Sequence, residues 1–286
     1  MNERPEKPGS IRLPVARRFM MTGLMYGLTL ATTRVEAQVI HTDTAGIETG
    51  EAQVPVADGV LPAYYARPLG SGPFPIVLVN EEVFGVHHYI ADICRRLAKA
   101  GYLAVAPEIY ARLADMSKLT DFSAIFRDVV SKAADATVLS DLDASVAWAA
   151  ANRGDTGRVG VTGFCRGGRN TWLYAAHNPT LKAAVAWYGP VAGPSTDIQP
   201  KTPADVATEL KCPLLGLYGG KDGNIRVADV QAAAAAARAA GHTVEIVVYP
   251  EAPHGFHADY RPSYRPGDAA DGWQRMLAWF RKYGVA

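Results

Sequence analysis

The segment Gly-Phe-Cys-Arg-Gly at residues 163–167 places Cys165 at the centre of a tight turn. The apolar residues in 159–164 predict a buried strand before the turn, and residues 169–177 predict a helix after it. Because glycine has no Cβ, the two flanking glycines let the strand and the helix approach closely enough for the turn to close. The central side chain of such a turn is held in a strained conformation above the sheet. This segment therefore predicts a strand–turn–helix unit with Cys165 as a candidate nucleophile.

The position of Cys165 before a helix also bears on its chemistry. The positive end of the helix dipole would favour the thiolate form of the cysteine. A buried structural cysteine in a glycine-rich turn is the alternative interpretation. Residues farther along the chain must decide between the two.

Length and charge limit the functions that need to be considered. The chain has 286 residues, is 49% hydrophobic and carries a formal net charge of +1. It can bury one large core, and no repeat or long linker divides it, so residues 38–286 are predicted to form a single domain. The small net charge gives no reason to expect nucleic-acid binding or a general attraction to anionic membranes.

The N-terminal segment has the pattern of an export signal. Arg17 and Arg18 precede an apolar run at 19–31, and Val-Glu-Ala at 35–37 is a small-x-small cleavage pattern. This predicts a twin-arginine export signal over residues 1–37 and a periplasmic or secreted protein. The apolar run is too short to span a bilayer, which needs about 20 residues. The alternatives are a disordered or uncleaved N-terminal anchor, and a cytoplasmic protein if the signal does not function.

The three cysteines, Cys94, Cys165 and Cys212, are an odd number for an exported protein. At least one thiol therefore stays unpaired within the monomer. Cys94 and Cys212 lie in apolar surroundings and are predicted to be buried without a catalytic role. No CxxC motif or His/Cys cluster indicates a metal site, and no cofactor is expected.

Apolar runs and helical patterns alternate along the rest of the chain. This alternation predicts an α/β fold with a mostly parallel sheet that helices cover on both faces. The predicted strands are 76–79, 103–106, 159–164, 183–187, 214–218 and 244–249, and the predicted helices are 88–100, 122–151, 169–177, 227–240 and 269–282. An antiparallel hairpin is predicted over 53–67, around the turn residues Asp58 and Gly59.

An acid and a histidine follow two later strands. Asp222 comes after the strand 214–218 and a glycine turn, and His254 comes after the strand 244–249. Either residue alone would be read as an ordinary loop residue. Together with Cys165 they stand in the order nucleophile, acid, histidine, each after a strand, where α/β sheets place their sites. His257 is the competing candidate for the base and ranks below His254, which directly follows the Pro turn.

With these residues in this order, the chain resembles the dienelactone hydrolase family of the α/β-hydrolase superfamily, from about residue 54 to the C-terminus. The segment Asn-Glu-Glu-Val-Phe-Gly-Val at 80–86 is similar to the family's strand-end Glu-x-Phe-Gly-Val motif. Gly101-Tyr102 and the segment Pro-Glu-Ile-Tyr-Ala-Arg at 107–112 are similarly placed. The resemblance implies an α/β-hydrolase fold and a small-molecule ester or lactone as the substrate. It does not indicate an oligomeric state.

The resemblance also implies roles for single residues. Cys165 would be the nucleophile, His254 the base and Asp222 the group that orients the base. Glu82 matches the family glutamate that contacts the resting thiol and takes part in its activation, whereas Glu81 is read as a solvated loop acid.

The same resemblance implies an oxyanion hole and a covalent mechanism. The backbone N–H groups of Val83 and Arg166 would stabilise the tetrahedral charge. Attack by Cys165 on an ester or lactone carbonyl would then form a thioester that water hydrolyses. Because thiolate is a good leaving group, attack on an ordinary amide would often revert, so a peptidase is not favoured.

One departure from the family pattern concerns the substrate. The family arginine that holds the substrate carboxylate, four residues after the histidine, is Ala258 here, and Asp259 follows it. Arg261, Arg265 or Arg127 could supply that contact, but each is read first as a solvated surface arginine. A preference for neutral esters would fit Ala258.

Two other functions remain open from the sequence. One is a broad-specificity carboxylesterase of the same fold. The other is a noncatalytic binding or thiol-sensing protein in which Cys165 is oxidised or forms an intermolecular disulfide.

Overall fold

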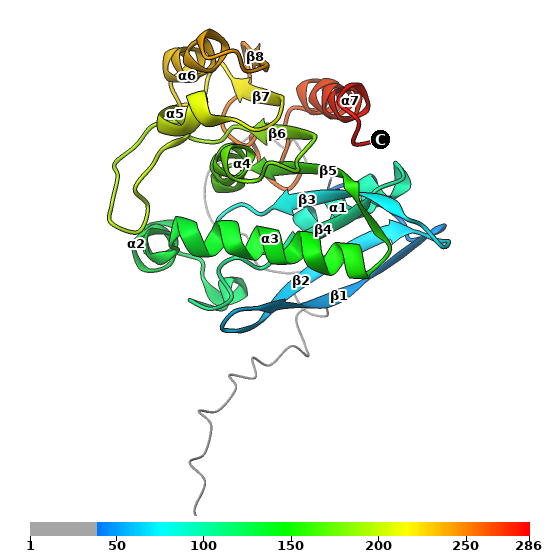
Figure 1. Cartoon of the computed structure of the whole chain (residues 1–286). Coiled ribbons are helices and arrows are strands. Elements are labelled where there is room, and N and C mark those ends of the chain that lie inside the picture. Colours follow the sequence, from blue (N-terminus) through cyan, green and yellow to red (C-terminus); the bar gives the residue numbers. More distant parts are fainter. Residues whose placement is uncertain (1–38) are drawn as a thin grey trace, which may run out of the picture.

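A computed structural model of the chain describes residues 39–286, and the predicted export signal at 1–37 lies outside these residues. Eight strands form one sheet in the order β1-β2-β4-β3-β5-β6-β7-β8 (Figure 1). The pairs β1/β2 and β2/β4 are antiparallel, and all other pairs are parallel. The strands are β1 Ile47–Val56, β2 Gly59–Pro68, β3 Phe74–Asn80, β4 Leu103–Pro107, β5 Gly154–Phe164, β6 Ala183–Trp187, β7 Leu214–Gly219 and β8 Val244–Tyr249. The predicted α/β fold is confirmed.

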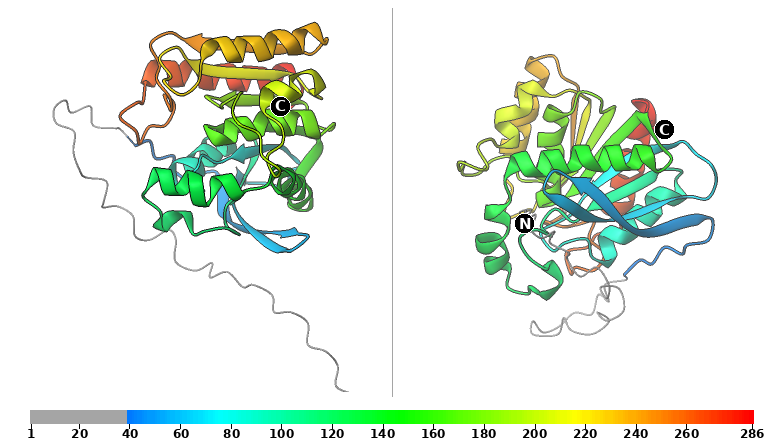
Figure 2. Two further views of the ribbon diagram at one scale, coloured as in Figure 1. Left: turned by 90° about the vertical axis from the view of Figure 1, so that its left-hand side faces the viewer. Right: turned by 60° about the horizontal axis from the view of Figure 1, so that its bottom comes forward.

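Helices cover both faces of the sheet. The neighbouring helices α3, α4, α5 and α6 lie on one face, whereas α1 and α7 lie together on the other (Figures 1 and 2). The helices are α1 His88–Lys99, α2 Phe122–Asp128, α3 Asp135–Ala151, α4 Arg166–His177, α5 Pro203–Val206, α6 Val227–Ala239 and α7 Pro266–Lys282. Within residues 39–286, none of these helices combines the length and the apolar character that crossing a membrane requires.

The central strands are apolar because they are buried on both faces. Every residue of β4, β6 and β7 is buried, and so is every residue of β3 after Phe74. A strand between two helical layers has no solvent face, so its sequence reads as a continuous apolar run instead of an alternating one. This is why the apolar runs in the sequence predicted these strands.

The predicted hairpin is present and extends beyond its predicted limits. Strands β1 and β2 pair in one register from Ile47 opposite Pro68 to Val56 opposite Gly59. Glu48 lies opposite Arg67, and the two side chains form an ion pair with an N–O distance of 2.7 Å. This cross-strand pair supports the part of the hairpin that the turn signal alone did not indicate.

The prediction of helical structure through 122–151 was wrong at one place. Between α2 and α3 the chain leaves the helix, and Ala134 has an extended backbone. The side-chain amide of Gln199 donates hydrogen bonds to the carbonyl oxygens of Val130 and Ala133, at 2.7 and 2.8 Å. These bonds satisfy carbonyl groups that a continuous helix would otherwise pair. A residue 66 positions away therefore supports the interruption.

Three other boundaries differ from the predicted ones by three or more residues. Strand β5 begins at Gly154, before the apolar run, because its first residues pair with Phe74 and Pro75 ahead of a register shift. Helix α4 begins at Arg166, since the carbonyl of Cys165 already accepts from the N–H of Gly168 at 2.9 Å. Helix α7 begins at Pro266, a residue suited to the first turn because its missing N–H would have no partner there.

Candidate active site

The predicted catalytic residues gather at one edge of the sheet. Glu82 follows β3, Cys165 follows β5, Asp222 follows β7 and His254 follows β8. Because these strands are parallel, their carboxyl ends meet at the same edge. The fold therefore places all four residues on one side of the molecule.

The turn around Cys165 has the strained geometry expected of a nucleophile elbow. Cys165 has φ 55° and ψ −119°, and its side chain is 8% exposed. A Cβ on Gly163 would lie 2.3 Å from the carbonyl oxygen of Gly167, and a Cβ on Gly167 would lie 2.3 Å from that of Asn80. Both contacts are with backbone, so neither can be relieved by a side-chain rotation. The glycines are therefore a steric requirement of the turn.

His254 and Asp222 form a hydrogen-bonded pair. Nδ1 of His254 lies 2.7 Å from Oδ2 of Asp222, whose side chain is 1% exposed. The other oxygen of Asp222 accepts from the backbone N–H groups of Asn224 and Ile225, at 2.9 and 3.2 Å. These bonds fix the carboxylate, and the carboxylate in turn orients the imidazole ring.

The surroundings of His254 stabilise its protonated form. Burial by itself would lower the pKa of His254, but hydrogen bonds to Asp222 and Cys165 outweigh it and raise the pKa to about 10. The ring of Tyr188 packs edge-on against the imidazole, with 5.2 Å between ring centroids. Both of the other residues of the predicted triad therefore favour the protonated form of His254.

His257, the competing candidate for the base, lies in the core. Its side chain is buried, and Nδ1 lies 2.7 Å from the hydroxyl of Tyr89. Burial, together with the charge of Arg96, lowers the pKa of His257 to about 3. The ring packs against Trp187 at a centroid distance of 4.5 Å. These contacts favour the ranking of His254 above His257.

The carboxylate of Glu82 is buried and held by the loop that follows β8. The hydroxyl of Tyr260 donates to Oε2 at 2.6 Å, and Nη2 of Arg261 donates to Oε1 at 3.0 Å. Nε2 of His87 lies 3.6 Å from Oε2. Burial would raise the pKa of Glu82, but the charge of Arg261 and the bonds from His87 and Tyr260 lower it to about 2. The expected contact of Glu82 with the resting thiol stays a prediction.

The reading of Arg261 as a solvated surface residue was wrong. Its side chain is 20% exposed and pairs with Glu82. The other two arginines lie in more exposed surface pairs, Arg265 with Asp268 and Arg127 with Asp128. The local sequence gives no sign of this difference, because the partner of Arg261 is 179 residues away.

Two acidic residues near the site, Glu81 and Asp259, are buried. Glu81 was expected to be a solvated loop acid, but it is 1% exposed. Its backbone packs on the elbow, since a Cβ on Gly167 would lie 2.5 Å from its carbonyl oxygen. Asp259 is also buried and forms an ion pair with Arg96 at 2.6 Å. Asp259 therefore balances an internal cation, which the sequence did not indicate.

Two backbone N–H groups at the elbow have no acceptor in the described part of the chain. They belong to Val83, in the turn after β3, and to Arg166, the first residue of α4. An N–H group that is free in the first turn of a helix can donate a hydrogen bond to a developing negative charge. These are the two groups that the resemblance assigned to an oxyanion hole.

The other two thiols are remote from this chemistry. Cys94 and Cys212 are buried and free, and burial raises the pKa of each, to about 12 for Cys212. Among residues 39–286, no three His, Cys, Asp or Glu side chains are arranged to hold a metal ion.

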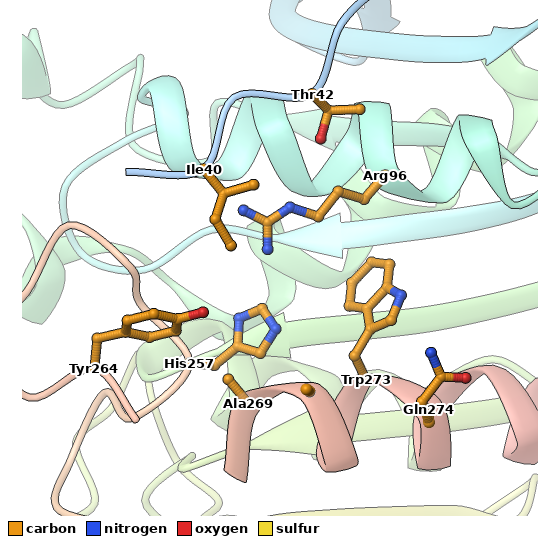
Figure 3. Close-up of a pocket in the computed structure, with 9 residues that line it drawn as sticks. Ile40, Thr42, Arg96, His257, Tyr264, Ala269, Trp273 and Gln274 are labelled. Carbon is orange, nitrogen blue, oxygen red and sulfur yellow. The ribbon is translucent and has the colours of Figure 1, made fainter. Parts of the chain in front are cut away.

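A separate pocket of about 300 Å³ lies between α1, α7 and the segment before β1 (Figure 3). His257 contributes to its wall, but Cys165 does not. The lining residues are Ile40, Thr42, Arg96, His257, Tyr264, Ala269, Ala270, Trp273 and Gln274. This pocket is therefore distinct from the site around the thiol.

Comparison with known proteins places the chain in a family. Residues 61–284 match the model of the dienelactone hydrolase family. A "Putative carboxymethylenebutenolidase" of Methylorubrum extorquens is 57% identical over 272 residues, which cover 94% of each chain. A protein with the same name from Escherichia coli K12 is 50% identical, with 93% of this chain and 98% of that protein covered.

A solved structure agrees with these relatives. The crystal structure titled "Putative Dienelactone Hydrolase" from Klebsiella pneumoniae has a TM-score of 0.81 and 55% sequence identity. The match covers 83% of this chain and 99% of that one. By its sequence, its fold and the residues that follow its strands, the chain belongs to the dienelactone hydrolase family.

Proposed function

We propose that this chain, an ester or lactone hydrolase by its family, acts through a covalent intermediate on Cys165. The observation that carries the proposal is the position of His254, which is hydrogen-bonded to Asp222 at 2.7 Å and whose pKa is raised by both Asp222 and Cys165. This arrangement supplies a nucleophile, a proton carrier and a group that orients the carrier.

In the first half of the reaction, Cys165 gives its proton to His254, and the resulting thiolate attacks the carbonyl carbon of the substrate. The negative charge on the carbonyl oxygen accepts hydrogen bonds from the N–H groups of Val83 and Arg166. The loss of one such donor typically raises the barrier by about 3 kcal/mol. The C–O bond then breaks, His254 gives its proton to the leaving oxygen, and a thioester remains on the enzyme.

In the second half, water attacks the thioester carbonyl while His254 takes a proton from it. The C–S bond breaks, the carboxylic acid leaves, and His254 returns its proton to Sγ, which restores the thiol–imidazole pair. Asp222 keeps the ring in the tautomer that presents Nε2 to the thiol and stabilises the charged imidazole. No step requires a metal or a cofactor.

Glu82 is proposed to take part in activating the thiol when substrate binds. This role comes from the family motif at 80–86. The bonds from Tyr260 and Arg261 make Glu82 a charged, ordered group at the edge of the site.

Loss of the nucleophile tests the mechanism. We expect Cys165→Ala to abolish hydrolysis of 4-nitrophenyl butyrate and of a dienelactone, with an unchanged circular dichroism spectrum. Cys212→Ala is the matched control, because it removes a buried thiol that faces no catalytic group. Trapping of an acyl group on Cys165 by mass spectrometry after rapid quenching would identify the thioester.

The same variants separate this proposal from a thiol-sensing role. If Cys165→Ala turns over both substrates as the wild type does, the covalent mechanism is wrong. A protein that hydrolyses neither substrate, but gains mass at Cys165 under mild oxidant, would instead support sensing.

A further inference from the structure

The pocket between α1, α7 and the segment before β1 contains two polar groups with unused hydrogen-bonding capacity. His257 is 2% exposed, its Nδ1 is paired with the hydroxyl of Tyr89, and its Nε2 has no partner among the described residues. Nη1 of Arg96 likewise finds no acceptor in the part of the chain that the structure describes. Both side chains line the pocket, and Figure 3 shows them between the rings of Tyr264 and Trp273. A buried imidazole with an unpaired nitrogen at a cavity wall is a group that a ligand can satisfy.

The rest of the pocket wall is mainly apolar and aromatic. Ile40, Ala269 and Ala270 contribute aliphatic groups. The ring of Trp273 stacks on that of His257, with 6.0 Å between the centroids and 26° between the planes. Aromatic rings favour such offset stacks, so the indole can also pack against a ring in the cavity. The volume of about 300 Å³ is at the lower end of the range for ligand pockets, which suits a ligand with a single aromatic ring.

The charges around the pocket favour a ligand without a charge. Arg96 donates to Asp92 through Nε and to Asp259 through Nη2, both at 2.6 Å, and Arg95 also donates to Asp92. These two arginines and two aspartates balance one another. Oδ1 of Asp259 is buried without a partner among the described residues, and burial raises the pKa of this carboxyl. An anionic ligand would add a second poorly solvated negative charge close to it, at a cost that an uncharged ligand avoids.

We infer that this pocket binds an uncharged phenol, with the ring against Trp273 and the hydroxyl group between His257 and Arg96. The hydroxyl oxygen accepts from Nη1 of Arg96. Because a hydroxyl group can donate as well as accept, it pairs with Nε2 of His257 in either tautomer of the imidazole. Cys165 is not among the lining residues, so binding here does not depend on the covalent mechanism.

Three matched ligands test the chemical class. Fluorine NMR titrations at neutral pH give the dissociation constants of 4-fluorophenol, 4-fluorotoluene and 4-fluorobenzoate, of which only the last is charged. Loss of the hydroxyl group in 4-fluorotoluene should weaken binding about three- to tenfold, as expected for a lost neutral hydrogen bond. The charge of 4-fluorobenzoate should also weaken binding relative to the phenol. The inference is wrong if either of these two ligands binds as tightly as 4-fluorophenol, or if the phenol does not bind.

A pair of substitutions on α7 tests the location. Ala270 lines the pocket and is exposed, so Ala270→Trp should fill part of the cavity without disturbing the core. We expect it to weaken the binding of 4-fluorophenol about tenfold or more, because the indole occupies the space of the ligand. Ala278→Trp is the matched control, since Ala278 is exposed on the same helix and does not line the pocket. Equal binding by the two variants would contradict the location.

Nitrogen NMR of the wild type with isotope-labelled histidines tests the contact itself. Addition of 4-fluorophenol should shift the Nε2 signal of His257, because that nitrogen gains a hydrogen-bond partner. The signals of His177, which lies at the surface in a pair with Asp143, should not move. A shift at His254 in place of His257 would locate the phenol beside the thiol and overturn the inference. This measurement requires no substitution, so it decides the question even if Ala270→Trp does not fold.

Discussion

Nη2 of Arg261 donates to Oε1 of Glu82 across 3.0 Å and so joins the loop after β8 to the turn after β3. The side chain of Glu82 is fully buried and that of Arg261 is 20% exposed. The same loop carries His254. This ion pair therefore joins the segment that holds the predicted base to the turn that contains Glu82 and Val83.

Removal of the cation in this pair should destabilise the protein. We expect Arg261→Met to lower the free energy of unfolding by about 3–5 kcal/mol, because it leaves a buried carboxylate without its ion-pair partner. Urea denaturation measures this change. Glu82→Gln combined with Arg261→Met should recover part of the loss. The control Arg275→Met breaks an exposed pair with Asp271 and should cost less than about 1 kcal/mol.

The carboxyl of Glu82 should make stability depend on acidic pH. Its pKa is about 2 in the folded protein, below the ordinary value of 4.5. The folded state therefore binds the proton less readily than the unfolded state, and the stabilisation is present above pH 4.5 and lost as the pH falls toward 2. Unfolding free energies measured across this range should show a shallower slope for Glu82→Gln. An equal slope in both proteins would contradict the assignment.

His254 should also make stability depend on pH, but its contribution should be lost as the pH rises into the alkaline range. Its pKa is raised from 6.5 to about 10, so its contribution to stability is full below pH 6.5 and is lost as the pH rises toward 10. Asp222→Asn removes one cause of the raised pKa and should lower it, as NMR titration of the His254 ring would show. The same variant should reduce kcat by about 10²–10⁴, because the imidazole loses its orienting partner.

The elbow should not tolerate a methyl group at Gly167. A Cβ there would lie 2.3 Å from the carbonyl oxygen of Asn80 and 2.5 Å from that of Glu81, and backbone cannot rotate away. We expect Gly167→Ala to cost about 1–3 kcal/mol of stability and to reduce esterase activity sharply, since the turn that holds Cys165 must shift. Gly267→Ala is the matched control, because its Cβ would meet no atom within 4 Å. Equal effects of the two substitutions would contradict the steric account.

The export signal is a separate proposal that follows from the sequence. We expect the chain to reach the periplasm in a bacterial host and to begin at Gln38 after cleavage. Replacement of Arg17 and Arg18 by lysine should keep the precursor in the cytoplasm, as cell fractionation and N-terminal sequencing would show. Unchanged export of that variant would argue against the twin-arginine route.

The features that depend on local sterics, burial pattern and strand direction could be predicted from the sequence. The elbow follows from the sterics of Gly163 and Gly167, and the continuous apolar strands follow from burial on both faces. The common location of Cys165, Asp222 and His254 follows from the geometry of parallel strands, whose carboxyl ends share an edge. Short-range conformational preference and strand direction suffice for these features.

The sequence by itself determined the fold class and the order of the candidate triad, because these depend on local sterics and on strand patterning. It also indicated the family, through its resemblance in the motifs at 80–86, 101–102 and 107–112. Only the tertiary structure decided that Arg261 pairs with Glu82, that His257 lies in the core and that Gln199 supports the break before α3. The physical reason is that the charge state and the contacts of a side chain depend on the groups that pack around it, and these groups come from distant parts of the chain.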